Sequence, residues 1–175
     1  MNKQAIISSA LKTIETEANA VAQLEAFVNE DFIKSVEVIA NTKGRLVVSG
    51  IGKSAIVAQK ITATLNSTGT PSLFMHAADA IHGDLGLILE DDIVIFISKS
   101  GNTPEIKVLV PLIKNYGNKI IAITGNDDSF LGEHADHTLS SFVEKEAFQT
   151  IKSETKFSSP SPVTLIDSLF FPREE

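Results

Sequence analysis

The sequence contains no cysteine and no apolar run long enough to cross a lipid bilayer. Without cysteine, the chain can form no disulfide bond and has no thiol for nucleophilic catalysis. A membrane-spanning helix needs about 20 apolar residues, whereas even the apolar segment DDIVIFIS at residues 91–98 begins with two aspartates. The N-terminal segment is polar and amphipathic and lacks the apolar core of a signal peptide. We therefore expect a cytoplasmic protein with no membrane partner.

Positive charge is also scarce, because 15 lysines and arginines stand against 22 aspartates and glutamates, for a formal net charge of −7. Nucleic-acid-binding domains are normally basic, so nucleic acid is not an expected partner. An anionic ligand would have to be held by a local set of donors. The 175 residues, 43% of them hydrophobic, suffice for one globular domain with a substantial core.

Hydrophobic periodicity divides the chain into three parts. In residues 1–42 apolar residues recur every three or four positions, which predicts two amphipathic helices. In residues 43–147 short apolar runs alternate with helical segments, which is typical of a doubly wound α/β fold. Residues 148–175 form a divergent tail in which only VTLIDSLFF, at 163–171, has the pattern of a short helix.

The central part predicts a parallel five-stranded sheet flanked by helices on both faces. Ligands bind such sheets beyond the carboxyl ends of the strands, where the loops gather. Residues 125–128, Gly-Asn-Asp-Asp, are ordinary turn chemistry. The predicted strands are 45–49, 72–75, 92–98, 119–124 and 137–140, and the predicted helices are 54–66, 78–81, 103–116 and 129–135.

The segment SGIGKSA, residues 49–55, follows the first predicted strand and precedes a helix. It is not a nucleotide P-loop, because Val47 stands where that motif needs its first glycine. A dinucleotide fingerprint needs an acidic residue at the end of the second strand, and His76 stands there instead. A glycine-rich turn before a helix still directs backbone N–H groups at an anion. We expect a phosphorylated small molecule, held by Ser49, Gly50, Gly52, Lys53 and Ser54.

A second loop of this kind is SKSGNTPE, residues 98–105, after the third predicted strand. Its hydroxyls and N–H groups gather where a helix begins, which favours phosphate binding. The alternative is a helix cap formed by Ser100 or Asn102, with Glu105 as the capping-box partner. The predicted phosphate ligands of this loop are Ser98, Ser100, Gly101, Asn102 and Thr103.

A third loop, residues 76–86, contains His76 and His82 together with Asp79 and Asp84. These residues could bind a metal, open a sugar ring by proton transfer, or serve only as polar groups at a strand end. The residues alone leave functional and structural roles equally open.

Two glutamates are candidate bases for moving a proton between adjacent carbons of a sugar. Glu105 lies one helical turn beyond the second loop, and Glu146 follows the last predicted strand. The alternatives are a capping box for Glu105 and a solvated charged run for Glu146. Lys53 could polarise a carbonyl or pair with the phosphate, or it could be a surface lysine.

Taken together, these motifs resemble the sugar isomerase (SIS) domain family, and within it the arabinose-5-phosphate isomerases of the Kdo (3-deoxy-D-manno-octulosonate) pathway. The resemblance runs from about Gly44 to Ala147, through SGIGKS, ISKSGNTPE, AITGNDDSFLGEHAD and VEKEA. The segment HGDLG, residues 82–86, is the most specific part. The resemblance implies a flavodoxin-like SIS fold and interconversion of D-ribulose 5-phosphate and D-arabinose 5-phosphate through a cis-enediol, for lipopolysaccharide or capsule biosynthesis. It implies no nucleotide or redox cofactor.

The resemblance also implies roles for single residues. Lys53, Glu105 and Glu146 match catalytic positions of the family, and the histidines are suited to assist ring opening. The position of His76 can also take an inhibitory zinc. The positions that match substrate contacts are Gly69, Thr70, His76 and His82.

The chain departs from the family pattern after EKEA, residues 144–147. The family continues with Cys-Pro and later supplies a histidine in a His-Pro-Gly-Gly turn, whereas this sequence has Phe148 and a different tail without that turn or the paired CBS modules of many relatives. Two alternatives therefore accompany the isomerase: a noncatalytic module that binds a phosphosugar or CMP-Kdo, and a 6-phospho-3-hexuloisomerase, against which HGDLG argues. SIS domains generally pair, so we expect a homodimer or homotetramer.

Overall fold

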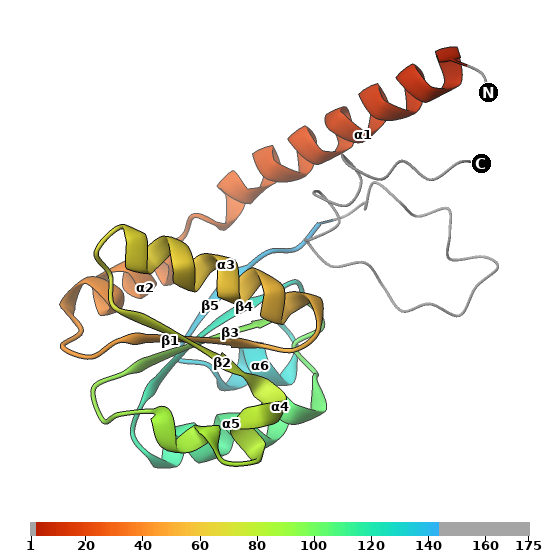
Figure 1. Ribbon diagram of the computed structural model, residues 1–175. Helices are drawn as coiled ribbons and strands as arrows, with labels where there is room; N and C mark the ends of the chain where they lie inside the picture. The colour runs from red at the N-terminus through yellow and green to blue at the C-terminus, as the bar shows by residue number, and fades with distance from the viewer. Residues whose placement is uncertain (1–2, 144–175) are drawn as a thin grey trace. The chain divides into compact units, whose positions relative to one another are not determined.

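The computed structural model describes residues 3–143, and residues 27–142 form one compact unit within it (Figure 1). This unit is built on a five-stranded sheet in which every neighbouring pair of strands is parallel, in the order β2-β1-β3-β4-β5. All five predicted strands are present, so the predicted doubly wound fold is confirmed. The strands are β1 (Leu46–Gly50), β2 (Ser72–His76), β3 (Ile93–Ser98), β4 (Lys119–Thr124) and β5 (His137–Ser140).

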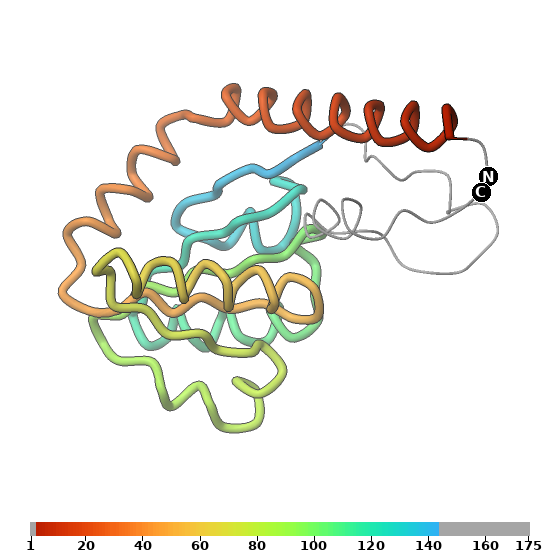
Figure 2. The backbone as a smooth tube through the Cα atoms, turned by 45° about the horizontal axis from the view of Figure 1, so that its top comes forward, coloured from red at the N-terminus to blue at the C-terminus, as the bar shows by residue number. Residues whose placement is uncertain are grey.

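Helices cover both faces of the sheet, because the central strands are apolar on both sides. On one face, β1 and β3 residues such as Val48 and Ile95 form a core cluster with α2 (Glu30–Asn41) and α3 (Lys53–Ser67). On the other, Val47 and Phe96 pack against α4 (Ala77–Ile81), α5 (Pro104–Asn115) and α6 (Phe130–His134). Consecutive strand residues face opposite sides, so near-continuous apolar runs are what a doubly covered sheet requires. Figures 1 and 2 show the two helical layers on either face of the sheet, with α3 alongside β1.

The N-terminal part contains the two predicted helices. Helix α1 (Lys3–Gln23) has no buried residue, and its apolar positions Ile7, Leu11 and Ile14 are exposed. A 3-10 turn, η1 (Leu24–Phe27), follows it. Helix α2 begins where Asn29 Oδ1 accepts hydrogen bonds from the backbone N–H groups of the first turn, as asparagine does at N-caps.

A second 3-10 turn, η2 (Asp84–Leu87), joins α4 to the approach of β3. Among residues 3–143, no helix is long and apolar enough to cross a membrane.

Candidate functional site

Two glycine- and serine-containing loops lie beside each other at the carboxyl edge of the sheet. Strands β1 and β3 are neighbours, and Gly50 at the end of β1 pairs in register with Ile97 of β3. The chain leaves β1 toward β2 on one side and leaves β3 toward β4 on the other. In open α/β sheets such a switch point is where ligands bind. The loops that follow β1 and β3 therefore flank the expected site, as their sequences predict.

The first loop leads directly into α3. Gly52 is the N-cap residue, with φ of +58°, a backbone conformation that glycine adopts without strain, and it has no side chain with which to cap the helix. Gly50 approaches α3 so closely that a Cβ atom there would lie 2.9 Å from the carbonyl carbon of Ser54. Lys53 is exposed and Ser54 is half-buried. The uncapped first turn of this 15-residue helix can donate its N–H groups to an anion.

The second loop leads in the same way into α5. Its N-cap residue is Thr103, and the Thr103 side chain makes no capping hydrogen bond because its Oγ1 lies 2.8 Å from Ser98 Oγ. The alternative of a cap by Ser100 or Asn102 is therefore not realised. Glu105 is half-buried in the first turn of α5. The N-termini of α3 and α5 thus follow neighbouring strands at one edge, and neither N-cap residue makes a side-chain capping hydrogen bond.

The hydroxyls of the second loop do not all face the expected ligand. Ser98 is buried and is hydrogen-bonded to Thr103. Asn102 donates from Nδ2 to Ser100 O and accepts at Oδ1 from Phe130 N. Ser100 is exposed. Ser100 is therefore the exposed hydroxyl of the loop, although its Oγ also accepts from Asn102 N at 3.3 Å, whereas the side chains of Ser98, Asn102 and Thr103 stabilise the loop.

Ser49, predicted as a phosphate ligand, is fully buried within β1. Its register neighbours are Met75 of β2 and Phe96 of β3, which both belong to the core cluster under α4, α5 and α6. Ser49 Oγ has no hydrogen-bond partner among the described residues. The strand period of two turns Ser49 into this cluster, against which Ile51 of the following loop also packs.

The two histidines of the third loop lie at opposite ends of α4. His76 ends β2 as the N-cap residue of α4; its side chain is 32% exposed, and its Nδ1 lies 3.7 Å from Asp79 Oδ2. His82 is the exposed C-cap residue of the same helix. Within residues 3–143, no group of three or more His, Cys, Asp or Glu side chains is placed to hold a metal ion. The zinc expected at His76 therefore has no complete ligand set in that range.

The structure does not bring Gly69 and Thr70 to the carboxyl edge. Both residues precede β2, and Pro71, the next residue, accepts a hydrogen bond from the N–H of Leu46 at the start of β1. They therefore lie at the amino ends of the strands, a full strand length from Gly50 and Ser98. Glu146, the second candidate base, lies outside the described residues.

The amino edge of the sheet carries a buried ion pair that the sequence did not predict. The side chain of Asp92 is fully buried, and its Oδ2 lies 2.7 Å from Arg45 Nη2. Burial raises the pKa of Asp92, but hydrogen bonds from the Arg45 side chain and from the N–H groups of Leu89 and Arg45 outweigh it, so the pKa lies below its ordinary value. The sequence signal was an arginine directly before one strand and an aspartate directly before its neighbour.

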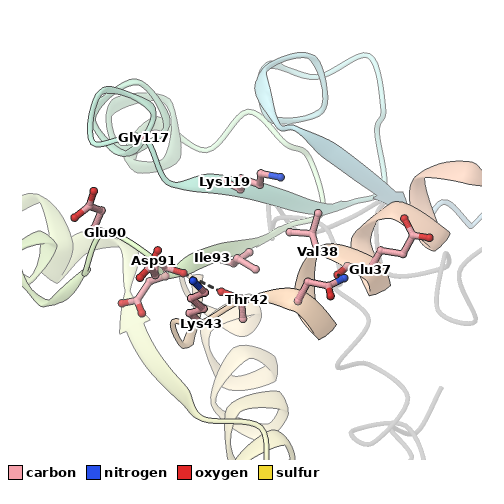
Figure 3. A pocket seen from close by; sticks show the side chains of 11 residues that line it. Glu37, Val38, Thr42, Lys43, Glu90, Asp91, Ile93, Gly117 and Lys119 are labelled. Carbon is pink, nitrogen blue, oxygen red and sulfur yellow. Dashed lines mark hydrogen bonds between the residues drawn. The ribbon is translucent and has the colours of Figure 1, made fainter.

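A pocket of about 540 Å³ opens at this amino edge, between α2 and the segments that enter β3 and β4 (Figure 3). Lys43, Asp91 and Lys119 are among its lining residues, and Thr42 Oγ1 donates a hydrogen bond to Asp91 O. Among residues 3–143, none of the predicted phosphate ligands or catalytic residues lines it. It is thus separate from the site at the carboxyl edge.

Comparison with known proteins extends the motif resemblance. The profile of the SIS domain family matches residues 39–170, which includes most of the tail beyond Ala147. The chain is 47% identical over 160 residues to the arabinose 5-phosphate isomerase KdsD of Pseudomonas aeruginosa, covering 91% of this chain and 48% of that protein. It is 47% identical over 135 residues to the arabinose 5-phosphate isomerase KpsF of Escherichia coli, covering 77% of this chain and 41% of that protein.

A solved structure is also similar to this chain. A structure of an Escherichia coli protein in complex with A5P superposes with a TM-score of 0.77 and is 37% identical in sequence, covering 85% of this chain and 79% of that chain. The present chain spans less than half the length of the two curated relatives.

Proposed function

The chain belongs to the SIS domain family, and from this premise we propose that it is a phosphosugar isomerase that interconverts D-ribulose 5-phosphate and D-arabinose 5-phosphate. The observation that carries the proposal is the pair of uncapped helix N-termini, of α3 and α5, beside the switch point of the sheet. Both can donate N–H groups to one phosphate. The choice of sugar is supported by the relatives named as arabinose 5-phosphate isomerases and by the related structure with A5P, which we take as arabinose 5-phosphate.

The phosphate is held by the loop from Gly50 to Ser54 and by Ser100 with the first turn of α5. These contacts form equally in substrate and transition state, so they contribute to affinity more than to turnover. Their mechanistic value is to place the sugar carbons at a defined distance from the side chains that act on them. The protein has a net negative charge, so its overall field does not attract a phosphate. This local set of N–H and hydroxyl donors provides the attraction instead.

Isomerisation requires one proton to move between two carbons. A base takes the proton from C2 of the open-chain aldose and returns it to C1, while a proton moves from the C2 hydroxyl to the C1 oxygen through the enediol. Glu105 is our proposed base, because it lies in the first turn of α5, directly beyond the phosphate loop. Lys53, exposed at the first turn of α3, stabilises the enediolate oxygen or the phosphate. This chemistry needs no redox cofactor or nucleotide.

Glu146 stays a second candidate base, and His82 a candidate for opening the sugar ring. We propose that the product, arabinose 5-phosphate, is used in Kdo biosynthesis and so in the synthesis of lipopolysaccharide or capsule. We also expect a homodimer or homotetramer, for which the exposed apolar residues of α1 offer a surface. Light scattering coupled to size exclusion tests that expectation directly.

A coupled assay of arabinose 5-phosphate formation from ribulose 5-phosphate tests the function. The purified 175-residue chain is assayed with a chelator that removes inhibitory zinc, with the Glu105→Gln variant as the matched control. We expect the chain to form arabinose 5-phosphate and the variant to lose at least about 100-fold in kcat.

Three other outcomes would contradict the proposal in distinguishable ways. Saturable binding of arabinose 5-phosphate without turnover would make the chain a phosphosugar-binding module. Binding of CMP-Kdo in preference to the pentose phosphates would indicate a pathway sensor. Turnover of a 3-hexulose 6-phosphate in place of ribulose 5-phosphate would indicate the hexuloisomerase.

A further inference from the structure

The loop between β3 and α5 is hydrogen-bonded to residues 125–131, which comprise the connection from β4 to α6 and the first two residues of α6. Three N–H groups of this segment donate to acceptors in the loop: Gly125 N to Lys99 O at 3.1 Å, Leu131 N to Gly101 O at 2.9 Å, and Phe130 N to Asn102 Oδ1 at 3.4 Å. The sequence had marked residues 125–128 only as a turn. In the structure the segment is the support of the second phosphate loop.

These hydrogen bonds determine which way the peptide groups of the loop face. In a trans peptide the C=O and the N–H point in opposite directions. Because the carbonyls of Lys99 and Gly101 point toward residues 125–131, the N–H groups of Ser100 and Asn102 point away from that segment. The N–H of Asn102 donates to Ser100 Oγ at 3.3 Å, so it orients the exposed hydroxyl of Ser100. Residues 125–131 therefore bind two carbonyl oxygens that would repel an anion and leave the N–H and hydroxyl of Ser100 on the other side of the loop.

Ser129 packs directly against Gly101 where the two segments meet. It is buried, and its Oγ accepts a hydrogen bond from Gly132 N as the N-cap of α6. A Cβ atom on Gly101 would lie 1.8 Å from Ser129 Oγ and 2.4 Å from Ser129 Cβ. Ser129 thus occupies the volume that a side chain at Gly101 would need, and Gly101 has φ of +62°. Only glycine satisfies both constraints, because it has no side chain and adopts a positive φ without strain.

We propose that Ser129 is a positioning residue for the phosphate site, which holds the loop of residues 98–103 in its anion-receiving conformation without touching the ligand. The inference rests on the proposed function only in that this loop binds phosphate. Ser129 fixes the first turn of α6, and that turn holds the carbonyl of Gly101. The N–H of the same peptide, on Asn102, is thereby aimed at Ser100 Oγ, which keeps its own hydrogen to donate to the ligand.

The experiment compares Ser129→Ala with Asn29→Ala, a matched control. Both residues are N-caps whose side chains accept backbone N–H groups, but Asn29 caps α2, away from the loop. Inorganic phosphate is titrated into the full chain while the amide resonances of residues 98–103 are followed, and KM, kcat and Tm are measured for each variant. We expect similar losses of Tm, because each variant loses one cap. Only Ser129→Ala should raise the Kd of phosphate and the KM of the sugar phosphate, by about fivefold, the factor that one N-cap contact represents, with kcat nearly unchanged.

A second pair of variants tests the packing itself. Gly101→Ala should weaken phosphate binding at least about tenfold, as expected for overpacking. Adding Ser129→Gly should restore part of it, because the two nearest obstructing atoms are gone and Thr124 Oγ1, at 3.0 Å, remains. Gly101→Ala and the double variant share the positive φ at residue 101. The difference between their phosphate affinities therefore reports the contact between the added Cβ and Ser129. If Gly101→Ala does not fold, the cap comparison decides alone.

The results separate this inference from the proposed function. Equal phosphate affinity and KM in Ser129→Ala and Asn29→Ala would overturn the positioning role, as would phosphate binding that leaves residues 98–103 unperturbed. A wild-type chain that binds phosphate through this loop but does not isomerise would overturn the proposed function alone, and the comparison of variants would still decide the role of Ser129.

Discussion

Ser98 Oγ and Thr103 Oγ1 lie 2.8 Å apart and hydrogen-bond to each other across the loop between β3 and α5. Ser98 Oγ also accepts from Gly101 N at 3.1 Å. The pair closes the loop on itself, and Ser100 stays exposed between the two ends. The hydroxyls of this loop look equivalent in the sequence, but those of Ser98 and Thr103 stabilise the loop, whereas that of Ser100 is exposed.

Ser100→Ala should raise the KM for arabinose 5-phosphate about tenfold or more, because a hydrogen bond to a charged group contributes on the order of 1.5–3 kcal/mol. The kcat should change little, since the phosphate contact is the same in substrate and transition state. Ser98→Ala should instead lower the free energy of unfolding by about 1 kcal/mol through loss of an internal hydrogen bond. Steady-state kinetics and urea unfolding of both variants separate these effects. A larger KM effect in Ser98→Ala would contradict the assignment.

Glu105→Gln should lower kcat by at least about 100-fold if Glu105 transfers the proton. The affinity for inorganic phosphate should be unchanged, because glutamine keeps the shape of the first turn. Glu133→Gln, at an exposed glutamate of α6, is the control and should behave like wild type. The same assay on Glu146→Gln ranks the two candidate bases, and a variant that retains turnover removes its glutamate from the role.

Gly50→Ala should destabilise the fold by about 1–3 kcal/mol, as overpacking does. The new Cβ would lie 2.9 Å from Ser54 C and 3.0 Å from Ser54 O, and backbone atoms cannot rotate away. The N-terminus of α3 must therefore shift, and phosphate affinity should fall with stability. Gly86→Ala is the control, because within residues 3–143 no atom beyond its chain neighbours lies within 4 Å of its added Cβ. It should stay within about 0.5 kcal/mol of wild type in thermal unfolding.

Asp92→Asn should lower the free energy of unfolding at pH 7 by about 3 kcal/mol, the lower end for breaking a buried pair, because Arg45 is 35% exposed. Asp92 accepts from Arg45 N and Leu89 N as well as from the guanidinium. Lys34→Ala, which breaks the exposed pair with Glu30, should cost less than about 0.5 kcal/mol.

The effect of Asp92 should depend on pH in one direction. The pKa of Asp92 is lower in the folded chain than its ordinary value, so the folded state stays ionised where the unfolded chain takes up a proton. The stabilisation is complete above about pH 4, the ordinary range of an aspartate, and is lost as the pH falls through the lowered folded pKa. Urea unfolding of wild type and Asp92→Asn at pH 7 and near pH 3 should give a difference that shrinks with acidity. A constant difference would contradict an ionised role for Asp92.

The order and type of the elements in residues 27–142 could be predicted from the sequence, because each strand is a short apolar run bounded by turn residues and each helix has its own period. The positions of the two glycine- and serine-containing loops after β1 and β3 were also predictable, and phosphate binding by them stays a prediction. The exposure of Ile7, Leu11 and Ile14 on α1 was not, because periodicity identifies an apolar face without saying what covers it.

The sequence by itself determined the local chemistry: which residues turn, where the glycine- and serine-containing loops lie, and which family the motifs resemble. Tertiary structure alone decided which of these residues meet. Strand order placed the ends of β1 and β3 side by side and left Gly69 and Thr70 at the far edge. The two-residue period of β1 buried Ser49, and the packing of α6 put Ser129 behind Gly101, across 28 residues of chain. Such distant contacts depend on how the sheet is assembled, which no window of neighbouring residues contains.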